Sequence, residues 1–272
     1  MNLPGGIGIG WRPEISGFVA GLPGLRFTEV IAESLPSRGP LSPALRELRE
    51  RGVVVVPHGI RLSLGGAAPV EPDRVAHLAR CAERLSAPLV SEHIAYVRAG
   101  GLEAGHLLPV PRTVEALDAL VDNVRRTQAE LPVPLALEPI AALLDWPDPE
   151  LSEVAFLTEV LERTGALLLL DIANIYANAR NRGEDPTMLL DGLPLERVAY
   201  AHVAGGAEHD GLYHDTHTDP TPPPVLELVR ELCARTSSPA LLLERDGAYP
   251  SAAELTAELD AIAAAAGLPA IT

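Results

Sequence analysis

The chain has 272 residues, of which 47% are hydrophobic and 21% charged, so it can bury a large core. Its formal net charge of −16 argues against a nucleic-acid partner, because DNA and RNA are bound by Lys and Arg side chains that neutralise phosphates. The chain has only two cysteines, which are too few for a disulfide framework, and few cysteines are typical of proteins in a reducing compartment. The first residues lack a signal-peptide pattern, and no apolar run approaches the ~18 residues of a membrane span. These features predict a cytoplasmic protein without a membrane partner.

Short apolar runs alternate with longer amphipathic segments along the chain. The predicted strands are residues 6–10, 26–30, 53–59, 89–93, 134–139, 167–174, 198–205 and 239–247. The predicted helices are residues 42–51, 72–86, 113–131 and 152–165, and the Pro-rich stretch 218–224 is expected to start the last helix, at 225–235. Residues 11–25 indicate only a loop or a short helix.

The predicted strands are continuously apolar, which favours parallel strands covered on both faces. A strand followed by a helix, repeated eight times, is typical of a (β/α)8 barrel. We find no linker and no low-complexity tract in the sequence. The sequence therefore predicts an α/β fold, a TIM barrel that forms a single domain over residues 1–272.

Polar side chains follow most of the predicted strands at their C-terminal ends. They are Glu29, Glu33, His58, Glu92, His93, Glu138, Asp171, Asn174, His202, Glu244 and Asp246. In a barrel of parallel strands these ends meet at one mouth, where barrel enzymes keep their active sites. Bare carboxylates gathered there would repel one another, and some would be forced to protonate. Asp171 poses the problem most sharply, because it ends a run of four leucines, and a buried charge is costly unless it is paired or bound to a metal.

Metal cations at the mouth would resolve this conflict. Taken singly, each residue has a simpler explanation, such as a strand-end Asp that caps the next helix. Seven of the eight predicted strands, however, end in a group that can bind a metal. A mixture of His, Asp and Glu without cysteine ligands suits iron, manganese or zinc. Three histidines and at least four carboxylates exceed the needs of one ion, so we expect two or three ions.

The segment that follows the seventh predicted strand is rich in His and Asp. Residues 204–219 contain His209, Asp210, His214, Asp215, His217 and Asp219. Such a cluster indicates either further metal ligands or a solvated polar lid. We favour ligands for Asp215 and His217, because of the resemblance described next.

Several motifs resemble a known family. They are HGIRLSLG (58–65), SEHIAY (91–96), LPVPRTVEALDALVDNVRRTQ (108–128), LALEP (135–139), LLLDIANIYANARNRG (168–183), LPLERVAYAHVAGG (193–206), DGLYHDTHTDPTPPPV (210–225) and LLLERD (241–246). Together they resemble the DUF692 family of multinuclear non-heme iron-dependent oxidative enzymes (MNIO), relatives of the methanobactin-biosynthesis oxidase. The resemblance runs from about Gly6 to Tyr249.

The resemblance implies a TIM barrel that holds two or three irons in a mixed-valent Fe2+/Fe3+ cluster. One iron would be held by His58, His93 and Glu138. Glu138 would bridge to a second iron, held by Asp171, His202 and Glu244. A third would be held by Asn174, Asp215 and His217.

The resemblance also implies a reaction. Members of the family use dioxygen as a co-substrate to modify ribosomally made precursor peptides, usually at cysteine, and often work with a small partner protein that binds the leader peptide. Thiolate sulfur binds iron readily, which suits this chemistry. The residues expected to be catalytic are Asp171, His202, Asp215 and His217, and those expected to contact substrate are Glu29, Tyr176, Arg180 and His214.

Two other functions remain open on the sequence alone. One is a zinc- or manganese-dependent sugar isomerase or endonuclease of the xylose-isomerase-like barrel class, which also uses strand-end His, Glu and Asp. The acidic charge disfavours the endonuclease, and the DTH motif at 215–217 disfavours the isomerase. The other is a metal-dependent binding protein without turnover.

Overall fold

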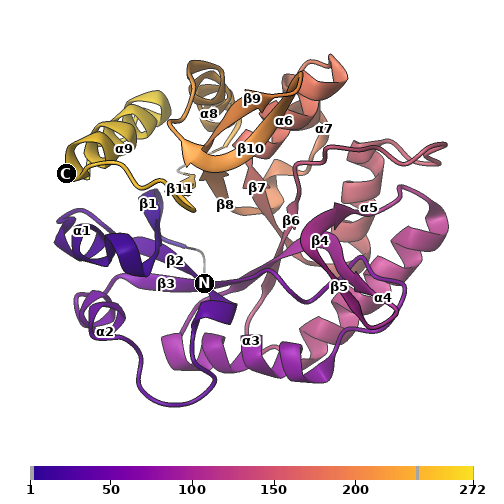
Figure 1. The fold of residues 1–272 in the computed structure, drawn as a ribbon, viewed down its shortest axis with the longest axis horizontal. Coiled ribbons are helices and arrows are strands. Elements are labelled where there is room, and N and C mark those ends of the chain that lie inside the picture. The colour runs from indigo at the N-terminus through magenta and orange to yellow at the C-terminus, as the bar shows by residue number, and fades with distance from the viewer. Residues whose placement is uncertain (1–2, 237–238, 272) are drawn as a thin grey trace.

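Eight parallel strands close into a barrel in the computed structural model, which describes residues 3–236 and 239–271 (Figure 1). Strand β1 pairs with both β2 and β11, and β3 pairs with both β2 and β4, so the ring is complete. The barrel strands are β1 (Gly6–Trp11), β2 (Phe27–Ile31), β3 (Val54–Gly59), β4 (Val90–Ala99), β6 (Leu135–Pro139), β7 (Leu167–Asp171), β8 (Val198–Val203) and β11 (Ala240–Leu243). The predicted fold class is therefore confirmed.

Helices surround the barrel on its outside (Figure 1). They are α1 (Ser16–Gly21), α2 (Pro43–Glu50), α3 (Pro72–Leu85), α4 (Val114–Glu130), α5 (Glu153–Thr164), α6 (Ile172–Arg182), α7 (Thr187–Gly192), α8 (Pro223–Arg235) and α9 (Ala252–Ala266), with 3-10 turns at Pro13–Ile15, Ala32–Ser34 and Leu195–Arg197. The long predicted helices agree closely because their ends carry local signals. In α5, the Ser152 side chain accepts a hydrogen bond from the Ala155 amide, and Gly165 ends the helix at φ 69°.

A small apolar cluster fills the barrel interior below the mouth. Among the described residues, six of its nine buried members stand two positions before a strand-end polar residue: Phe27 before Glu29, Val56 before His58, Ala136 before Glu138, Leu169 before Asp171, Tyr200 before His202, and Leu242 before Glu244. Side chains two positions apart on a strand share one face, so both residues of each pair point inward. The larger apolar cluster joins the strands to the helices. The interior is therefore apolar below and polar at the mouth.

Two antiparallel hairpins extend the mouth, and neither was predicted. Strand β4 continues to Ala99 and pairs with β5 (Leu102–Pro109). The His- and Asp-rich segment after β8 folds as β9 (Gly205–His209) and β10 (Leu212–Asp219). Polar and glycine-rich composition hid both hairpins, because neither has the continuous apolar run of a barrel strand.

Two sequence-based expectations need correction. The Pro-rich stretch starts α8, but α8 is not the last helix, because α9 follows β11. A capping box between Ser251 and Glu254 marks the start of α9, and its S-x-x-E pattern was visible in the sequence. The predicted strand 167–174 ends at Asp171, where α6 begins. Within residues 3–236 and 239–271, no helix is both long enough and apolar enough to cross a membrane.

Candidate metal centre

The strand-end side chains converge at the C-terminal mouth of the barrel, as predicted. Neighbouring strands place His93 beside Glu138, and Asp171 beside His202, in direct register. The five residues His58, His93, Glu138, Asp171 and His202 are all buried. The regular two-residue repeat of the barrel interior therefore brings residues that are far apart in sequence into one cluster.

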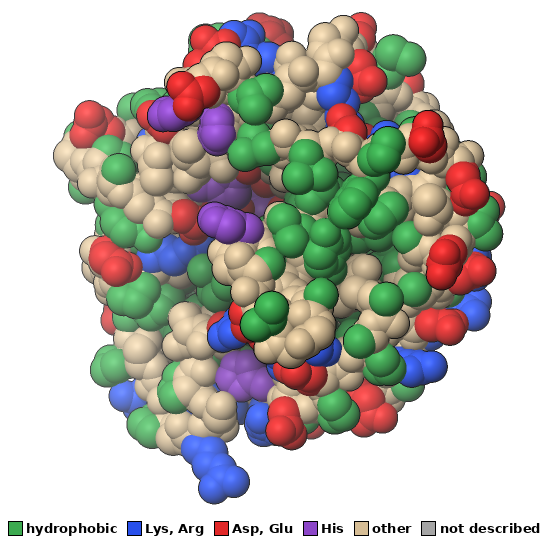
Figure 2. Space-filling view, turned by 45° about the vertical axis from the view of Figure 1, so that its right-hand side comes forward, with side chains coloured by type: hydrophobic (Ala, Val, Ile, Leu, Met, Phe, Trp, Pro, Cys, Tyr) green, Lys and Arg blue, Asp and Glu red, His purple; other side chains and the backbone are tan. Residues whose placement is uncertain are grey.

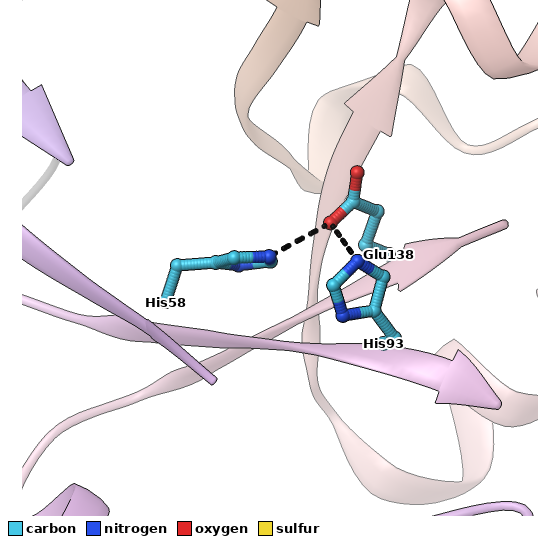
Figure 3. Close-up of side chains that lie close together, drawn as sticks. All are labelled: His58, His93 and Glu138. Atoms are coloured by element: carbon cyan, nitrogen blue, oxygen red, sulfur yellow. Dashed lines mark ion pairs between the residues drawn. The ribbon is translucent and has the colours of Figure 1, made fainter. Parts of the chain in front are cut away.

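One group of the cluster consists of His58, His93 and Glu138 (Figure 3). Glu138 Oε2 lies 3.5 Å from His58 Nε2 and 3.2 Å from His93 Nε2. The two imidazole rings meet edge to face, with centroids 4.6 Å apart. Two ring nitrogens and a carboxylate oxygen from three strands thus face a common point.

In each of these histidines, the other ring nitrogen contacts a second polar group that fixes the orientation of the ring. His58 Nδ1 lies 2.8 Å from Ser91 Oγ, and His93 Nδ1 lies 3.2 Å from the Gly59 carbonyl oxygen. His202 follows the same rule with the nitrogens exchanged, because its Nε2 lies 2.9 Å from Glu29 Oε2. Metal-binding histidines are usually fixed in this way, with one nitrogen bonded to an outer partner and the other free for the ion.

A second group surrounds the free nitrogen of His202. His202 Nδ1 lies 2.9 Å from Glu244 Oε2, 3.2 Å from Glu138 Oε1 and 3.9 Å from Asp171 Oδ2. Asp171 Oδ1 accepts a hydrogen bond from the Asn174 amide at 2.9 Å and so caps α6. Asp171 Oδ1 therefore caps the next helix, which is the simpler explanation for a strand-end Asp, while Oδ2 faces the cluster.

The β9–β10 hairpin contributes a third group, from His217 and Asp215. His217 Nε2 lies 2.6 Å from Asp215 Oδ2 and 3.8 Å from Asp171 Oδ2, and His217 Nδ1 lies 3.4 Å from Glu244 Oε2. The His217 backbone has φ 55°, in the left-handed region that non-glycine residues seldom adopt. A shift of register in β10 between His214 and Asp219 accompanies this conformation, and β-bulges of this kind re-aim side chains beside functional sites.

Several buried polar atoms of the cluster have no hydrogen-bond partner among the described residues. They are Glu29 Oε1, Glu138 Oε2, Asp171 Oδ2, His202 Nδ1 and Asp215 Oδ1. A buried polar atom without a partner is costly, and its presence in a native site calls for an explanation. Four sets of three residues lie close enough to hold an ion: His58, His93 and Glu138; Glu29, His202 and Glu244; Glu138, Asp171 and His202; and Asp171, His217 and Glu244. The possible ligand atoms are imidazole nitrogens and carboxylate oxygens, which suit iron, manganese and zinc.

The charges of the cluster shift its pKa values in the metal-free protein. Burial, reinforced by the nearby Asp215, raises the pKa of Asp171 to about 8. Burial lowers the pKa of His93, but the carboxylates of Glu138, Glu92 and Glu244 together outweigh this effect and raise it to about 9. Both groups therefore hold protons near neutral pH, and these are the protons that a bound cation would displace.

Sequence reasoning missed three residues beside the cluster. The Arg12 guanidinium donates hydrogen bonds to Glu244 Oε1 at 3.1 Å and to Asp246 Oδ1 at 2.6 Å, and it partly neutralises the acidic mouth. Arg12 follows directly after β1, so the strand-end rule could have found it. Ser91 and Tyr200 lie within strands, where alternation of inward and outward residues was the available signal.

A cavity of about 840 Å³ opens onto the cluster. Its polar part includes His58, His93, Glu138, Asn174, Asp215, His217, Glu244 and Asp246. Its other wall is formed by β5 and by residues 140–144, where Leu143 and Leu144 are exposed. Figure 2 shows histidine side chains at a hollow in the surface, with a field of hydrophobic side chains beside it.

The residues expected to contact substrate lie elsewhere. Glu29 is fully buried behind His202, and Tyr176, Arg180 and His214 gather at the β9–β10 hairpin. The Arg180 guanidinium pairs with Glu208, and the Tyr176 ring meets that of Tyr213 at 5.0 Å. In the described part of the chain, none of the four expected residues lines the cavity. Their contact with substrate stays a prediction.

The closed barrel and the His and carboxylate groups at its C-terminal mouth define a TIM barrel with a candidate multinuclear metal centre. A family model for RiPP precursor modification enzymes of the MbnB/TglH/ChrH type matches residues 6–267. The chain belongs to this family of enzymes, and its motif-based assignment is confirmed.

Curated relatives carry the description UPF0276 protein. One from Streptomyces avermitilis is 55% identical over 264 residues, which are 94% of this chain and 54% of that protein, so the chain spans about half of its length. One from Caulobacter vibrioides (strain NA1000 / CB15N) is 37% identical over 259 residues, covering 94% of this chain and 92% of that protein.

Solved structures with the same fold are more distant. An endonuclease IV from Thermus thermophilus has a TM-score of 0.62 at 20% identity, covering 95% of this chain and 98% of that one. A putative xylose isomerase from Rhodospirillum rubrum has a TM-score of 0.58 at 15% identity, covering 97% and 99%. At these identities the likeness shows the barrel fold alone.

Proposed function

We propose that the chain is a multinuclear iron- and dioxygen-dependent oxidoreductase that modifies a ribosomally synthesised precursor peptide at a cysteine. The main support is the geometry of His58, His93 and His202. In each of them, one ring nitrogen contacts an outer polar group and the other faces shared carboxylates. Membership in a family described as RiPP precursor modification enzymes supports the peptide substrate. A leader-binding partner protein belongs to the same proposal.

The side-chain groups suggest how two or three mixed-valent Fe2+/Fe3+ ions would be held. One would be held by His58, His93 and Glu138, a second by Glu138, Asp171, His202 and Glu244, and a third by Asn174, Asp215 and His217. Bound iron would supply one-electron redox chemistry and reaction with dioxygen at the mouth. The residues that we expect to act on the reacting atoms are Asp171, His202, Asp215 and His217.

The protein's own contribution is to position the peptide and exclude water. The wall formed by β5 and residues 140–144 would bury apolar side chains of the peptide beside the metal ligands. The polar floor would receive the reacting cysteine, whose thiolate is a suitable ligand for iron. Tyr176, Arg180 and His214, on and beside the β9–β10 hairpin, would contact the part of the peptide that lies outside the cavity.

Metal content and peptide mass test this proposal together. The protein would be purified without oxygen from iron-supplemented cells, its metals measured, and a cysteine-containing precursor peptide encoded beside its gene added with and without O2. We expect two or more irons per chain, a coloured protein, and an O2-dependent mass change that is absent when the peptide cysteine is replaced by alanine. A colourless protein filled with zinc or manganese and active on a sugar would overturn the proposal.

A further inference from the structure

A row of hydrogen bonds below the mouth joins His58 to His202. His58 Nδ1 lies 2.8 Å from Ser91 Oγ, and Ser91 Oγ lies 2.7 Å from the Tyr200 hydroxyl. The Tyr200 hydroxyl donates to Glu29 Oε2 at 2.5 Å, and Glu29 Oε2 also lies 2.9 Å from His202 Nε2. All five residues are buried. The row therefore links buried residues from four barrel strands.

Counting protons gives every bond in the row a direction. Tyr200 gives its single proton to Glu29, so it must accept the proton of Ser91. Ser91 has then used its own proton and must accept one from Nδ1 of His58. The Glu29 carboxylate has only acceptors, so Nε2 of His202 must donate to it. The proton that each histidine directs into the row is thus fixed, so in the neutral, metal-binding form His58 keeps Nε2 free and His202 keeps Nδ1 free.

The two free nitrogens are the ones that face Glu138. His58 Nε2 lies 3.5 Å from Glu138 Oε2, and His202 Nδ1 lies 3.2 Å from Glu138 Oε1. We propose that Ser91, Tyr200 and Glu29 form a positioning relay that fixes the tautomers of two metal-binding histidines in different ion groups and so couples the two groups. This inference rests on the metal centre of the proposed function. It gives the fully buried Glu29 a role through His202 in place of the expected substrate contact.

Two isosteric or smaller variants break the relay without removing a ligand. Tyr200→Phe deletes only the hydroxyl and keeps the ring that packs edge to face on Phe27. Ser91→Ala interrupts the row one bond closer to His58. Thr28→Val is the matched control, because the Thr28 hydroxyl is also fully buried in the barrel and donates to the Ile9 carbonyl oxygen at 2.5 Å, outside the relay.

The probe is Co2+, titrated into metal-free protein and followed by its visible absorption, which reports ligand geometry. We expect Tyr200→Phe and Ser91→Ala each to weaken Co2+ affinity by about 10–100-fold and to shift the absorption bands, as loss of an outer partner of a ligand does. In the double variant the loss should be close to that of either single variant, because both changes break one row. Thr28→Val should bind Co2+ as the unmodified protein does, at whatever cost in melting temperature.

The outcomes separate the two proposals. If the unmodified protein binds Co2+ but Tyr200→Phe and Ser91→Ala match it in affinity and spectrum, the relay is wrong and the metal centre stands. Losses that multiply in the double variant would also overturn the relay. If the unmodified protein binds neither Co2+ nor Fe2+, the proposed function fails and the relay fails with it. Should Tyr200→Phe not fold, the comparison of Ser91→Ala with Thr28→Val decides alone.

Discussion

Glu138 Oε1 lies 3.2 Å from His202 Nδ1, yet no hydrogen bond of ordinary geometry joins the two atoms. In the neutral form of His202 that could bind a metal, Nε2 donates to Glu29 and Nδ1 carries no proton, so two electron pairs face each other across this gap. Such an arrangement is unfavourable unless a metal cation lies between the pairs or, in the metal-free protein, a proton on Nδ1 of His202 does. The other oxygen of Glu138 faces His58 and His93, which places this carboxylate between two ion groups.

Glu138→Gln should therefore cost more bound metal than any other single change at the mouth. The amide keeps the shape of the side chain but removes the charge and one acceptor, so both ion groups that share Glu138 are weakened. We expect metal content to fall by more than one ion per chain and turnover to fall by more than the roughly 10–100-fold that loss of an outer partner costs. Metal analysis of purified protein measures the first effect.

Glu92→Gln is the matched control for this change. Glu92 is equally buried at the same mouth, but its oxygens accept hydrogen bonds from the Leu62 and His93 amides at 3.0 Å and 2.9 Å. Because Glu92 Oε1 also lies 3.7 Å from His93 Nδ1, its loss should lower the melting temperature and cost less bound metal than Glu138→Gln does. Equal metal content in Glu138→Gln and the unmodified protein would contradict the bridging position.

His217→Ala should remove one ion and leave the others. His217 reaches the cluster from the β9–β10 hairpin, while His58 and His93 come from barrel strands that do not depend on it. His209→Ala is a control on the same hairpin, because the His209 side chain is 73% exposed. Metal analysis should show a partial loss in the first variant and none in the second. A complete loss of metal in His217→Ala would show that the ions bind only as one unit.

The stability of the metal-free protein should fall as pH rises from 6.5 to 9. The pKa of His93 is raised from 6.5 to about 9, and that of Asp171 from 3.8 to about 8. A group with a raised pKa stabilises the folded state fully below its unfolded value, and this contribution is lost as pH rises through the folded value. Loss of the His93 proton and loss of the Asp171 proton therefore both lower the stability of the folded state over this pH range.

Bound metal should abolish this dependence, because the cation replaces the displaced protons. Melting temperatures of metal-free and metal-loaded protein across the same pH range test the expectation, and metal affinity should rise with pH over it. A metal-free protein that is as stable at pH 9 as at pH 6.5 would contradict the shifts.

The sequence predicted the barrel strands and their polar ends because both are local signals. A continuous apolar run followed by His58, Glu138 or His202 can be read directly along the chain, and closure of the barrel brings these ends together without further information. The strand-end rule even reaches Arg12, once the first strand is extended to Trp11.

What the sequence did not predict depends on contacts between distant segments. The relay through Ser91 and Tyr200 requires the two strands to face each other across the barrel interior. The burial of Glu29 behind His202 is equally non-local, so the sequence could not place this carboxylate beside the His202 ring. The hairpins at the mouth lack apolar periodicity, and the position of His217 depends on a bulge that leaves no clear pattern in the sequence.

The base of the β9–β10 hairpin offers a last test, away from any ligand. A Cβ atom added to Gly205 would lie 2.2 Å from the Asp219 carbonyl oxygen, which is backbone and cannot move aside cheaply. Gly205→Ala should therefore spread the hairpin, displace His217 and lose the same ion that His217→Ala loses, although no ligand has changed. Gly17→Ala is the control, since nothing lies within 4 Å of its added Cβ in α1, and it should be neutral or stabilise by up to ~1 kcal/mol. Full metal content in Gly205→Ala would mean that the hairpin does not position the third group.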